Sequence, residues 1–116
     1  MRPESAIQRQ VRKALAQLGF EAIAVPNGAV LAGGKEQRAR QMNALKADGL
    51  RVGFPDLLIY ASGGRMGHME VKTDKGSQND NQRAVEGWMK AWGHKYAVVR
   101  SDAEAVEAVK SWGWVS

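Results

Sequence analysis

The sequence predicts an α/β fold in which helices flank a small mixed central sheet. Short apolar runs of strand length alternate with longer segments whose apolar residues recur at helical spacing. Strands mixed with flanking helices are typical of a sheet covered on both faces. The 116 residues suit one domain spanning residues 1–116, and 44% of them are hydrophobic, which is enough for a core. The expected element order is α-β-(α)-β-β-α-β-α.

The first expected element is a helix over residues 3–19. Pro3 suits its first turn and Gly19 suits a C-terminal cap. An apolar stripe at helical spacing runs along it, formed by Ile7, Val11, Leu15 and Leu18. Glu4 lies on the same face as this stripe. Its carboxylate either compensates the helix dipole or points into a site beneath the helix.

In the middle of the chain, the sequence predicts three strands and a second helix. Residues 20–26, "FEAIAVP", form a strand closed by Pro26, residues 27–34 a mobile linker, and residues 35–47 a helix. Two further strands, "DLLIY" at 56–60 and "HMEVK" at 68–72, form a hairpin around the long turn "ASGGRMG".

In the last third of the chain, the sequence predicts a helix over residues 80–93, a strand over 95–101 and a helix over 102–113. Ser101 and Glu104 form a capping box that opens the last helix. One side of the helix over 80–93 is apolar and comprises Val85, Trp88, Met89 and Trp92. This spacing favours a place in the core for both tryptophans. Trp112 and Trp114 either seal the core or belong to a subunit interface.

The chain is basic, with 17 Lys and Arg against 12 Asp and Glu, a formal charge of +5 and a pI of about 9.8. A pI above roughly 9 is common in nucleic-acid-binding domains. One basic segment precedes the hairpin and contains Lys35, Arg38, Arg40, Lys46 and Arg51. This segment is either a solvated helix face or a surface that contacts phosphates.

The chain contains no cysteine, which excludes disulfides, thiolate zinc sites and cysteine nucleophiles. No apolar run approaches the roughly 18 residues that cross a membrane. The first ten residues lack the apolar stretch of a signal peptide. We therefore expect a soluble, cytoplasmic protein with no membrane role.

Three charged residues, Asp56, Glu70 and Lys72, occupy the expected hairpin strands. An ionised group removed from water costs several kcal/mol unless it is paired or binds a metal. Glu70 and Lys72 are two residues apart and therefore share a face. If Asp56 pairs with Lys72, or the register slides by an even count, all three charges meet on that face.

Such a cluster allows two interpretations. Two carboxylates and a lysine in one pocket suit Mg²⁺, which prefers oxygen ligands and can activate water and neutralise charge on a phosphoryl oxygen. In a basic protein this predicts phosphodiester cleavage. Alternatively, the three side chains form a structural ion-pair cluster on an exposed sheet face.

The ordered motifs resemble a known nuclease superfamily. Pro-Asp at 55–56 followed by Glu-Val-Lys at 70–72 is similar to the PD-(D/E)xK signature. The superfamily's restriction-endonuclease-like core order matches the expected order if the basic segment is an insertion. Over essentially its whole length the chain resembles a stand-alone virus-type replication-repair nuclease (VRR-NUC) domain of phage or prophage type. The supporting residues are Glu4, "PNG" at 26–28, "GFPDLLIY" at 53–60, "MEVKTDKGSQNDNQ" at 69–82 and "YAVVRS" at 96–101.

This resemblance implies a metal site. Asp56, Glu70 and the Val71 carbonyl would hold Mg²⁺ or Mn²⁺, and Glu4 would assist directly or through water. Lys72 would be the catalytic lysine.

Further roles concern residues around that site. Gln82 matches the glutamine that opens the helix after the catalytic strands and faces the site; the alternative is an ordinary helix-start amide. We also expect Lys75 to contact DNA together with the basic segment. His68 shares a face with Glu70 and is either a neighbour of the chemistry or unrelated to it, whereas His94 is expected to have no chemical role.

The resemblance implies a metal-dependent, structure-selective DNA endonuclease that acts like a Holliday-junction resolvase, and a homodimer would supply the two cuts that a four-way junction requires. The alternatives are a nuclease directed to flaps, nicks or RNA, and a non-catalytic DNA-binding module. A small structural protein is a third class.

Overall fold

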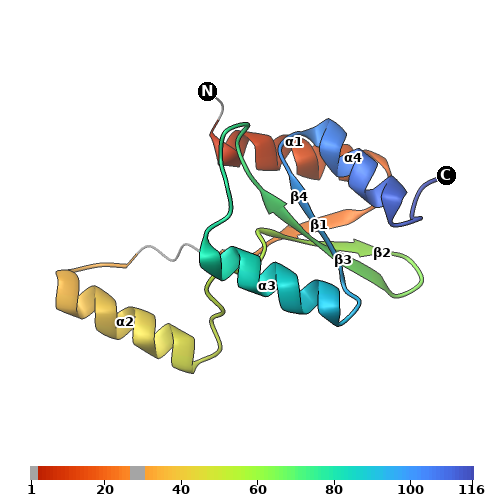
Figure 1. Cartoon of the computed structure of the whole chain (residues 1–116). Helices are drawn as coiled ribbons and strands as arrows, with labels where there is room; N and C mark the ends of the chain where they lie inside the picture. The colour runs from red at the N-terminus through yellow and green to blue at the C-terminus, as the bar shows by residue number, and fades with distance from the viewer. Residues whose placement is uncertain (1–2, 27–30) are drawn as a thin grey trace.

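The computed structural model describes residues 3–26 and 31–116. Residues 27–30 of the expected linker, which include the last two residues of the "PNG" motif, lie outside the described residues. Figure 1 shows one sheet with helices on both sides and one helix apart from it. The elements in chain order are α1 (Glu4–Gln17), β1 (Glu21–Ala24), α2 (Lys35–Ala47), β2 (Leu57–Ala61), β3 (Arg65–Val71), α3 (Asp80–Ala91), β4 (Lys95–Val99) and α4 (Asp102–Ser111).

The sheet has four strands in the order β1-β2-β3-β4. β1 and β3 both run antiparallel to β2, and β4 runs parallel to β3. The β3–β4 connection is a crossover through α3, as a parallel pair requires. Helices α1 and α4 pack on one face of the sheet and α3 on the other (Figure 1). The prediction of a small mixed sheet flanked by helices is therefore confirmed.

The hairpin turn is shorter than predicted. Ala61 pairs with Arg65, so the loop is residues 62–64 and the rest of "ASGGRMG" belongs to the strands. Gly63 and Gly64 both adopt a φ of 75°, which glycine tolerates because it has no Cβ. Two adjacent glycines thus allow a tight reversal.

The main core lies between the sheet and α1 with α4. Ile7, Val11 and Leu15 are buried on α1, whereas Leu18, predicted to extend the stripe, is 37% exposed because it is the C-cap residue. Gly19 follows with a φ of 90°, as expected for a helix C-terminus.

Trp112 and Trp114 pack against this core from the C-terminal end. The ring of Trp114 meets Phe20 edge-on at 5.6 Å between centroids, and the Trp112 ring lies so close to Gly67 that a Cβ there would be 2.6 Å from it. Both tryptophans therefore pack against the chain's own core, as the first of the two interpretations predicts, and both are partly buried.

A second, smaller core lies under α3 and contains Val85, Met89 and Tyr96, with Trp88 packed at its side. Trp92 is not part of it and is 73% exposed, so its predicted place in the core is wrong. It is the C-cap residue of α3, and its ring lies against that of Trp88, at 5.1 Å between centroids.

Helix α2 stands away from the sheet (Figure 1), and none of its residues is buried. Local bonds hold its N-terminus: the Gly34 N–H donates to Gln37 Oε1 at 2.9 Å, and the Gln41 amide exchanges two bonds with the backbone of Ala32. The helix is therefore an arm rather than a layer of the core.

None of the helices in the described ranges is both long enough and apolar enough to cross a membrane.

Candidate metal and catalytic site

The sheet brings Asp56, Glu70 and Lys72 to one end of the face on which α3 packs. Leu57 pairs with Met69, so Asp56, one residue earlier, stands opposite Glu70. This register differs by two residues from an Asp56–Lys72 pairing, an even count, so the three side chains share a face as expected. The Val25 N–H donates to the Asp56 carbonyl at 2.8 Å, which continues the β1–β2 ladder to this residue.

The Asp56 carboxylate is held by the neighbouring strand. Its Oδ2 accepts a hydrogen bond of 2.8 Å from the Val71 N–H. Within a strand the N–H and C=O of one residue point the same way, so the Val71 carbonyl also lies on the Asp56 side of β3. The other carboxylate oxygen of Asp56 has no backbone hydrogen bond among the described residues.

Glu70 is buried, with 1% of its surface exposed. Burial, followed by a shared hydrogen bond with Asp56 and the Asp56 charge, raises the pKa of Glu70 to about 9, and the Glu4 charge adds to the rise. The Lys72 ammonium acts in the opposite direction. Among the described residues, Glu70 Oε2 has no hydrogen-bonding partner.

Lys72 is also largely buried, with 9% of its surface exposed. The ion pairs between described residues are Arg83–Asp80, Lys90–Glu86 and Lys110–Glu107, all within helices, and none involves Lys72. The structural ion-pair cluster, the alternative interpretation of the three charges, is therefore not what the structure contains.

The donor set fits a hard divalent cation. A buried oxygen of Glu70 without a partner among the described residues, the second oxygen of Asp56 and the Val71 carbonyl are the oxygen ligands that Mg²⁺ prefers. The described part of the chain holds no cluster of three or more His, Cys, Asp or Glu side chains suited to a metal. A cation at this site would therefore have two carboxylate ligands and complete its shell with the carbonyl and water.

Two further residues, Glu4 and Gln82, are also expected at the site. Glu4 is exposed in the first turn of α1 and acts on Glu70 through its charge, which fits the water-mediated role better than direct ligation. Gln82 Oε1 accepts from the Asn79 N–H at 3.0 Å, and Asn79 Oδ1 accepts from the Gln82 N–H. The Gln82 oxygen is thus engaged in a capping box, as the helix-start alternative predicts.

His68 lies two residues before Glu70 on the same face and is buried, with 5% exposed. Its ring meets Phe54 and His94 edge-on, at 5.8 and 6.2 Å between centroids. Burial and the His94 charge both lower the pKa of His68. His68 is therefore a buried neighbour of the site, in surroundings that favour its neutral form.

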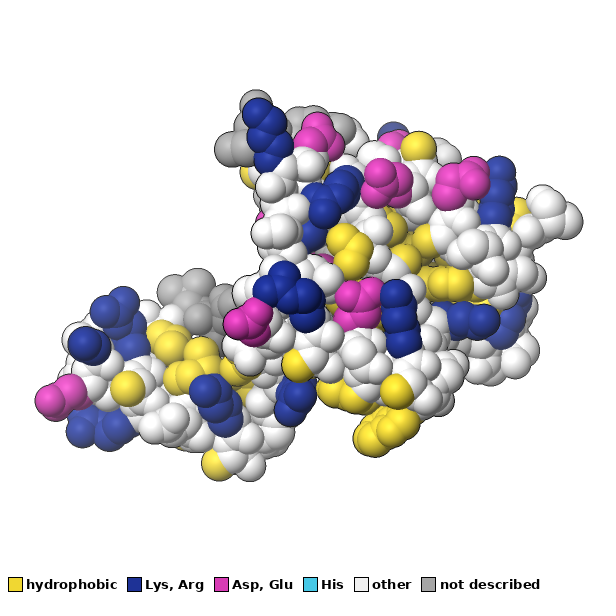
Figure 2. All heavy atoms as spheres, viewed as in Figure 1, with side chains coloured by type: hydrophobic (Ala, Val, Ile, Leu, Met, Phe, Trp, Pro, Cys, Tyr) yellow, Lys and Arg dark blue, Asp and Glu magenta, His cyan; other side chains and the backbone are white. Residues whose placement is uncertain are grey.

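The predicted DNA-binding residues lie on two exposed segments. Lys35, Arg38, Arg40 and Lys46 are on α2, with Arg51 on the segment that follows, and Lys75 is in the loop between β3 and α3. Figure 2 shows Lys and Arg side chains gathered over α2.

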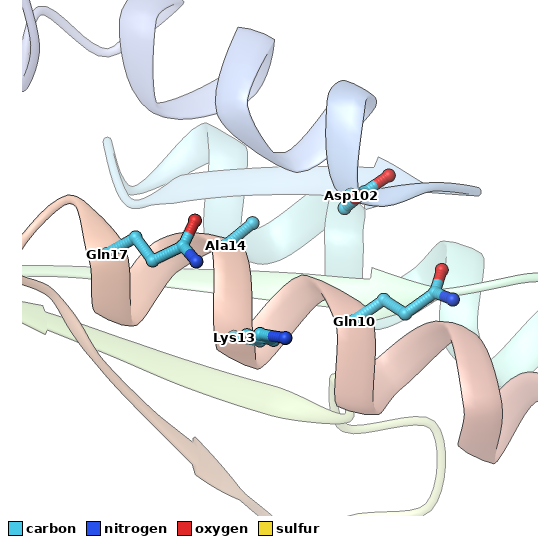
Figure 3. Close-up of a pocket in the computed structure, with 5 residues that line it drawn as sticks. All are labelled: Gln10, Lys13, Ala14, Gln17 and Asp102. Atoms are coloured by element: carbon cyan, nitrogen blue, oxygen red, sulfur yellow. The ribbon is translucent and has the colours of Figure 1, made fainter.

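A separate surface depression lies between α1 and α4 and is lined by Gln10, Lys13, Ala14, Gln17 and Asp102 (Figure 3). It belongs to the opposite layer of the molecule, and its residues point away from the stripe that faces the core. It therefore has no part in the carboxylate site.

The sequence reasoning missed two polar side chains of β4 and its end. Arg100 and Tyr96 hydrogen-bond the loop that follows Lys72. Both lie in the run "YAVVRS", but only the parallel pairing of β4 with β3 brings their side chains beside the site.

No family model matches the chain, and no curated protein matches it. A solved structure titled "VRR_NUC domain" superposes on it with a TM-score of 0.66 over 92% of this chain and 94% of that one, at 18% sequence identity. The chain has the VRR_NUC fold. At this identity the likeness concerns the fold, and it agrees with the PD-(D/E)xK-like architecture expected from the motifs. In the VRR_NUC fold of this chain, the Pro-Asp and Glu-Val-Lys motifs meet at one end of the sheet.

Proposed function

We propose that the protein is a metal-dependent nuclease that hydrolyses phosphodiester bonds in DNA. The observation that carries this proposal is the adjacent pair of Asp56 and Glu70, with a buried Glu70 oxygen that has no partner among the described residues. Keeping two carboxylates together in a buried place raises the free energy of their ionised forms, which a structural role does not require. A bound cation would remove that penalty.

Asp56, Glu70 and the Val71 carbonyl would hold Mg²⁺ or Mn²⁺, with Glu4 acting through water. The bound cation would supply an activated water and neutralise charge on the scissile phosphate. The protein orients the ligands: the Val71 N–H fixes one Asp56 oxygen, and the β2–β3 pairing sets Glu70 opposite Asp56.

Lys72 is the proposed catalytic lysine. Its ammonium shares a face with both carboxylates and is close enough to lower the pKa of Glu70. An ammonium group in this position can stabilise the negative charge that develops on phosphoryl oxygens. Gln82 keeps its proposed place at the edge of the site, with its side-chain oxygen already engaged by the α3 cap.

The basic residues of α2, together with Arg51 and Lys75, are the proposed phosphate contacts. An exposed helix with four cations and one acid, Glu36, suits the charge of a DNA backbone. A detached arm of this kind would lie along a duplex beside the cut site.

The proposed substrate is branched DNA, in particular a four-way junction, cut by a homodimer. A chain with one carboxylate site makes one cut, and two copies about a twofold axis would match the junction's approximate symmetry. We place this activity in the cytoplasm of a bacterial cell, with a phage or prophage origin.

The test compares wild type with Asp56→Asn on labelled four-way junction, flap, nicked duplex, duplex, single-stranded DNA and RNA, with Mg²⁺, Mn²⁺ or EDTA. Asparagine keeps an oxygen to accept from the Val71 N–H but removes a charged ligand, so cleavage should be lost while DNA binding persists. Glu107→Gln, on the surface of α4, is the matched control and should cut like wild type.

The panel also decides between the alternatives. Preferential cutting of flaps or nicks would assign that substrate instead of the junction. DNA binding without cleavage in any metal would leave the non-catalytic binding module. An Asp56→Asn protein that cuts as fast as wild type would contradict the site assignment.

A further inference from the structure

The loop of residues 73–79 begins directly after Lys72, the last residue of β3's hydrogen-bonded run. The Lys72 N–H still donates to the Val99 carbonyl on β4, at 3.0 Å. Beyond it the chain leaves the sheet and reaches α3 at Asp80. The conformation of this loop therefore determines the direction in which the chain leaves Lys72.

Arg100 lies next to Lys72 across the sheet. β3 and β4 are parallel and Val71 pairs with Val99, so the next residues along, Lys72 and Arg100, are neighbours. Arg100 Nη1 donates to the Thr73 carbonyl at 2.6 Å and to the Gly76 carbonyl at 2.5 Å. Hydrogen bonds from a charged donor are roughly twice as strong as neutral ones.

These two carbonyls belong to one tight turn. The Gly76 N–H donates to the Thr73 carbonyl at 3.1 Å, and a Cβ at residue 76 would lie 2.9 Å from Thr73 Oγ1. The turn is thus compact, and Arg100 holds both of its ends. Farther along the loop, Gln78 Nε2 donates to the Tyr96 hydroxyl at 3.1 Å, a second attachment to β4.

Arg100 is itself fixed at the backbone. Its N–H donates to Glu104 Oε1 at 2.8 Å, while the Glu104 N–H donates to Ser101 Oγ at 3.1 Å. Only the serine half of the predicted capping box forms, because the Glu104 carboxylate accepts from the Arg100 N–H and not from the Ser101 N–H. The start of α4 therefore anchors the arginine that holds the loop.

We propose that Arg100 is a positioning residue that holds the Thr73–Gly76 turn against β4 and thereby sets the orientation of Lys72 at the carboxylates. This rests on the proposed nuclease function. Without the guanidinium, the Thr73 and Gly76 carbonyls lose their charged donor. Of the side-chain hydrogen bonds that join the described loop to β4, only the one from Gln78 to Tyr96 would remain. A displacement of about 1 Å in a reacting group can reduce a rate roughly 100-fold.

The test uses Arg100→Met, Arg100→Lys and the control Arg12→Met. Arg12 Nε donates to the Ala22 carbonyl at 2.9 Å, so the control removes an arginine–carbonyl bond far from the loop. Two readouts need no activity: hydrogen exchange of the residue 74–79 amides, and acetylation of Lys72 relative to exposed Lys110. The third is the single-turnover rate on the DNA that wild type cuts fastest.

In Arg100→Met we expect loop exchange to rise at least about tenfold, Lys72 to be acetylated faster, and single-turnover cleavage to fall by about 10- to 100-fold. Because a single nitrogen, Arg100 Nη1, donates both bonds, the lysine ammonium of Arg100→Lys should bring loop exchange, Lys72 acetylation and cleavage part of the way back to wild-type values. If Arg100→Met fails to fold, Arg100→Lys is compared with wild type in its place. Arg12→Met should leave all three unchanged.

Wild-type loop exchange and Lys72 acetylation in both Arg100 variants would overturn the proposal. So would an Arg100→Met protein with a loosened loop and wild-type cleavage. If wild type cuts no DNA, the nuclease proposal fails by itself, and the exchange and acetylation readouts still decide whether Arg100 positions Lys72.

Discussion

Glu70 is buried beside a second carboxyl group, and this environment favours its protonated form. Its pKa of about 9 lies far above the ordinary value of 4.5, with burial as the largest cause. Between these two pH values the folded protein holds a proton that the unfolded chain releases. Stability contributed by the protonated group is therefore full below pH 4.5 and is lost as the pH rises through about 9.

Glu70→Gln should remove this pH dependence. Without divalent metal, the wild type should lose stability relative to the variant by up to about 1.4 kcal/mol per pH unit between pH 5 and 9. Urea unfolding at pH 5.5, 7 and 8.5 in EDTA measures the difference, with Glu107→Gln as the control. Parallel stability profiles for Glu70→Gln and wild type would contradict the raised pKa.

Lys72→Ala should reduce turnover much more than DNA affinity. The side chain is largely buried and shares a face with the carboxylates, so in the proposed nuclease its charge would act on the reacting phosphate and not on the DNA surface as a whole. Single-turnover rates and equilibrium DNA binding separate the two effects, and a fall of roughly 100-fold or more in rate is expected. A variant whose only defect is weak binding would make Lys72 a phosphate anchor.

Among the elements, α2 is the helix that packing against the protein core does not stabilise, because none of its residues is buried. Isolated helices of about this length are marginal in water. Local bonds hold the two ends of α2, at Gly34 and Ala32 on the N-terminal side and from the N–H groups of residues 48–50 on the C-terminal side. Its four cations are exposed on a helix that stands away from the sheet. Contact with a phosphate backbone would stabilise the helix and place the substrate.

Neutralising two lysines of α2, Lys35→Gln with Lys46→Gln, should weaken duplex binding and flatten its salt dependence. Removing one bond between a basic side chain and a phosphate lowers the slope of log affinity against log salt by about 0.9. The matched control neutralises Lys13 and Lys110, on α1 and α4. Equal salt slopes for the α2 variant and wild type would place the DNA-binding surface elsewhere.

At the scale of the whole molecule, a dimer needs apolar surface that the core does not use. Trp112 and Trp114 already pack against their own chain's core. Ile23, Tyr60 and Met66, each at least 40% exposed, lie on one face of β1–β3, the face on which α3 packs against β4. These three side chains are the apolar surface of the described sheet that remains for a second copy.

Light scattering at micromolar concentration should give roughly twice the 12.7 kDa chain mass. Tyr60→Arg should shift the mass toward the monomer and reduce paired cutting of a four-way junction, while single cuts in simpler substrates persist. A strictly monomeric wild type that cuts only flaps or nicks would remove the junction-resolving proposal and leave the nuclease.

The element order, the buried stripe of α1 and the shared face of Glu70 and Lys72 could be predicted from the sequence, and Asp56 joins that face in any hairpin register shifted by an even count. These follow from periodicity within a segment and from strand parity, which survives any even shift of register. Four features depend on how the chain packs in three dimensions: Asp56 stands opposite Glu70, the Gln82 oxygen caps α3, Trp92 is exposed and α2 stands apart. The tertiary structure also decided the place of Arg100 beside Lys72, because a parallel pairing joins residues far apart in sequence and no local pattern encodes it.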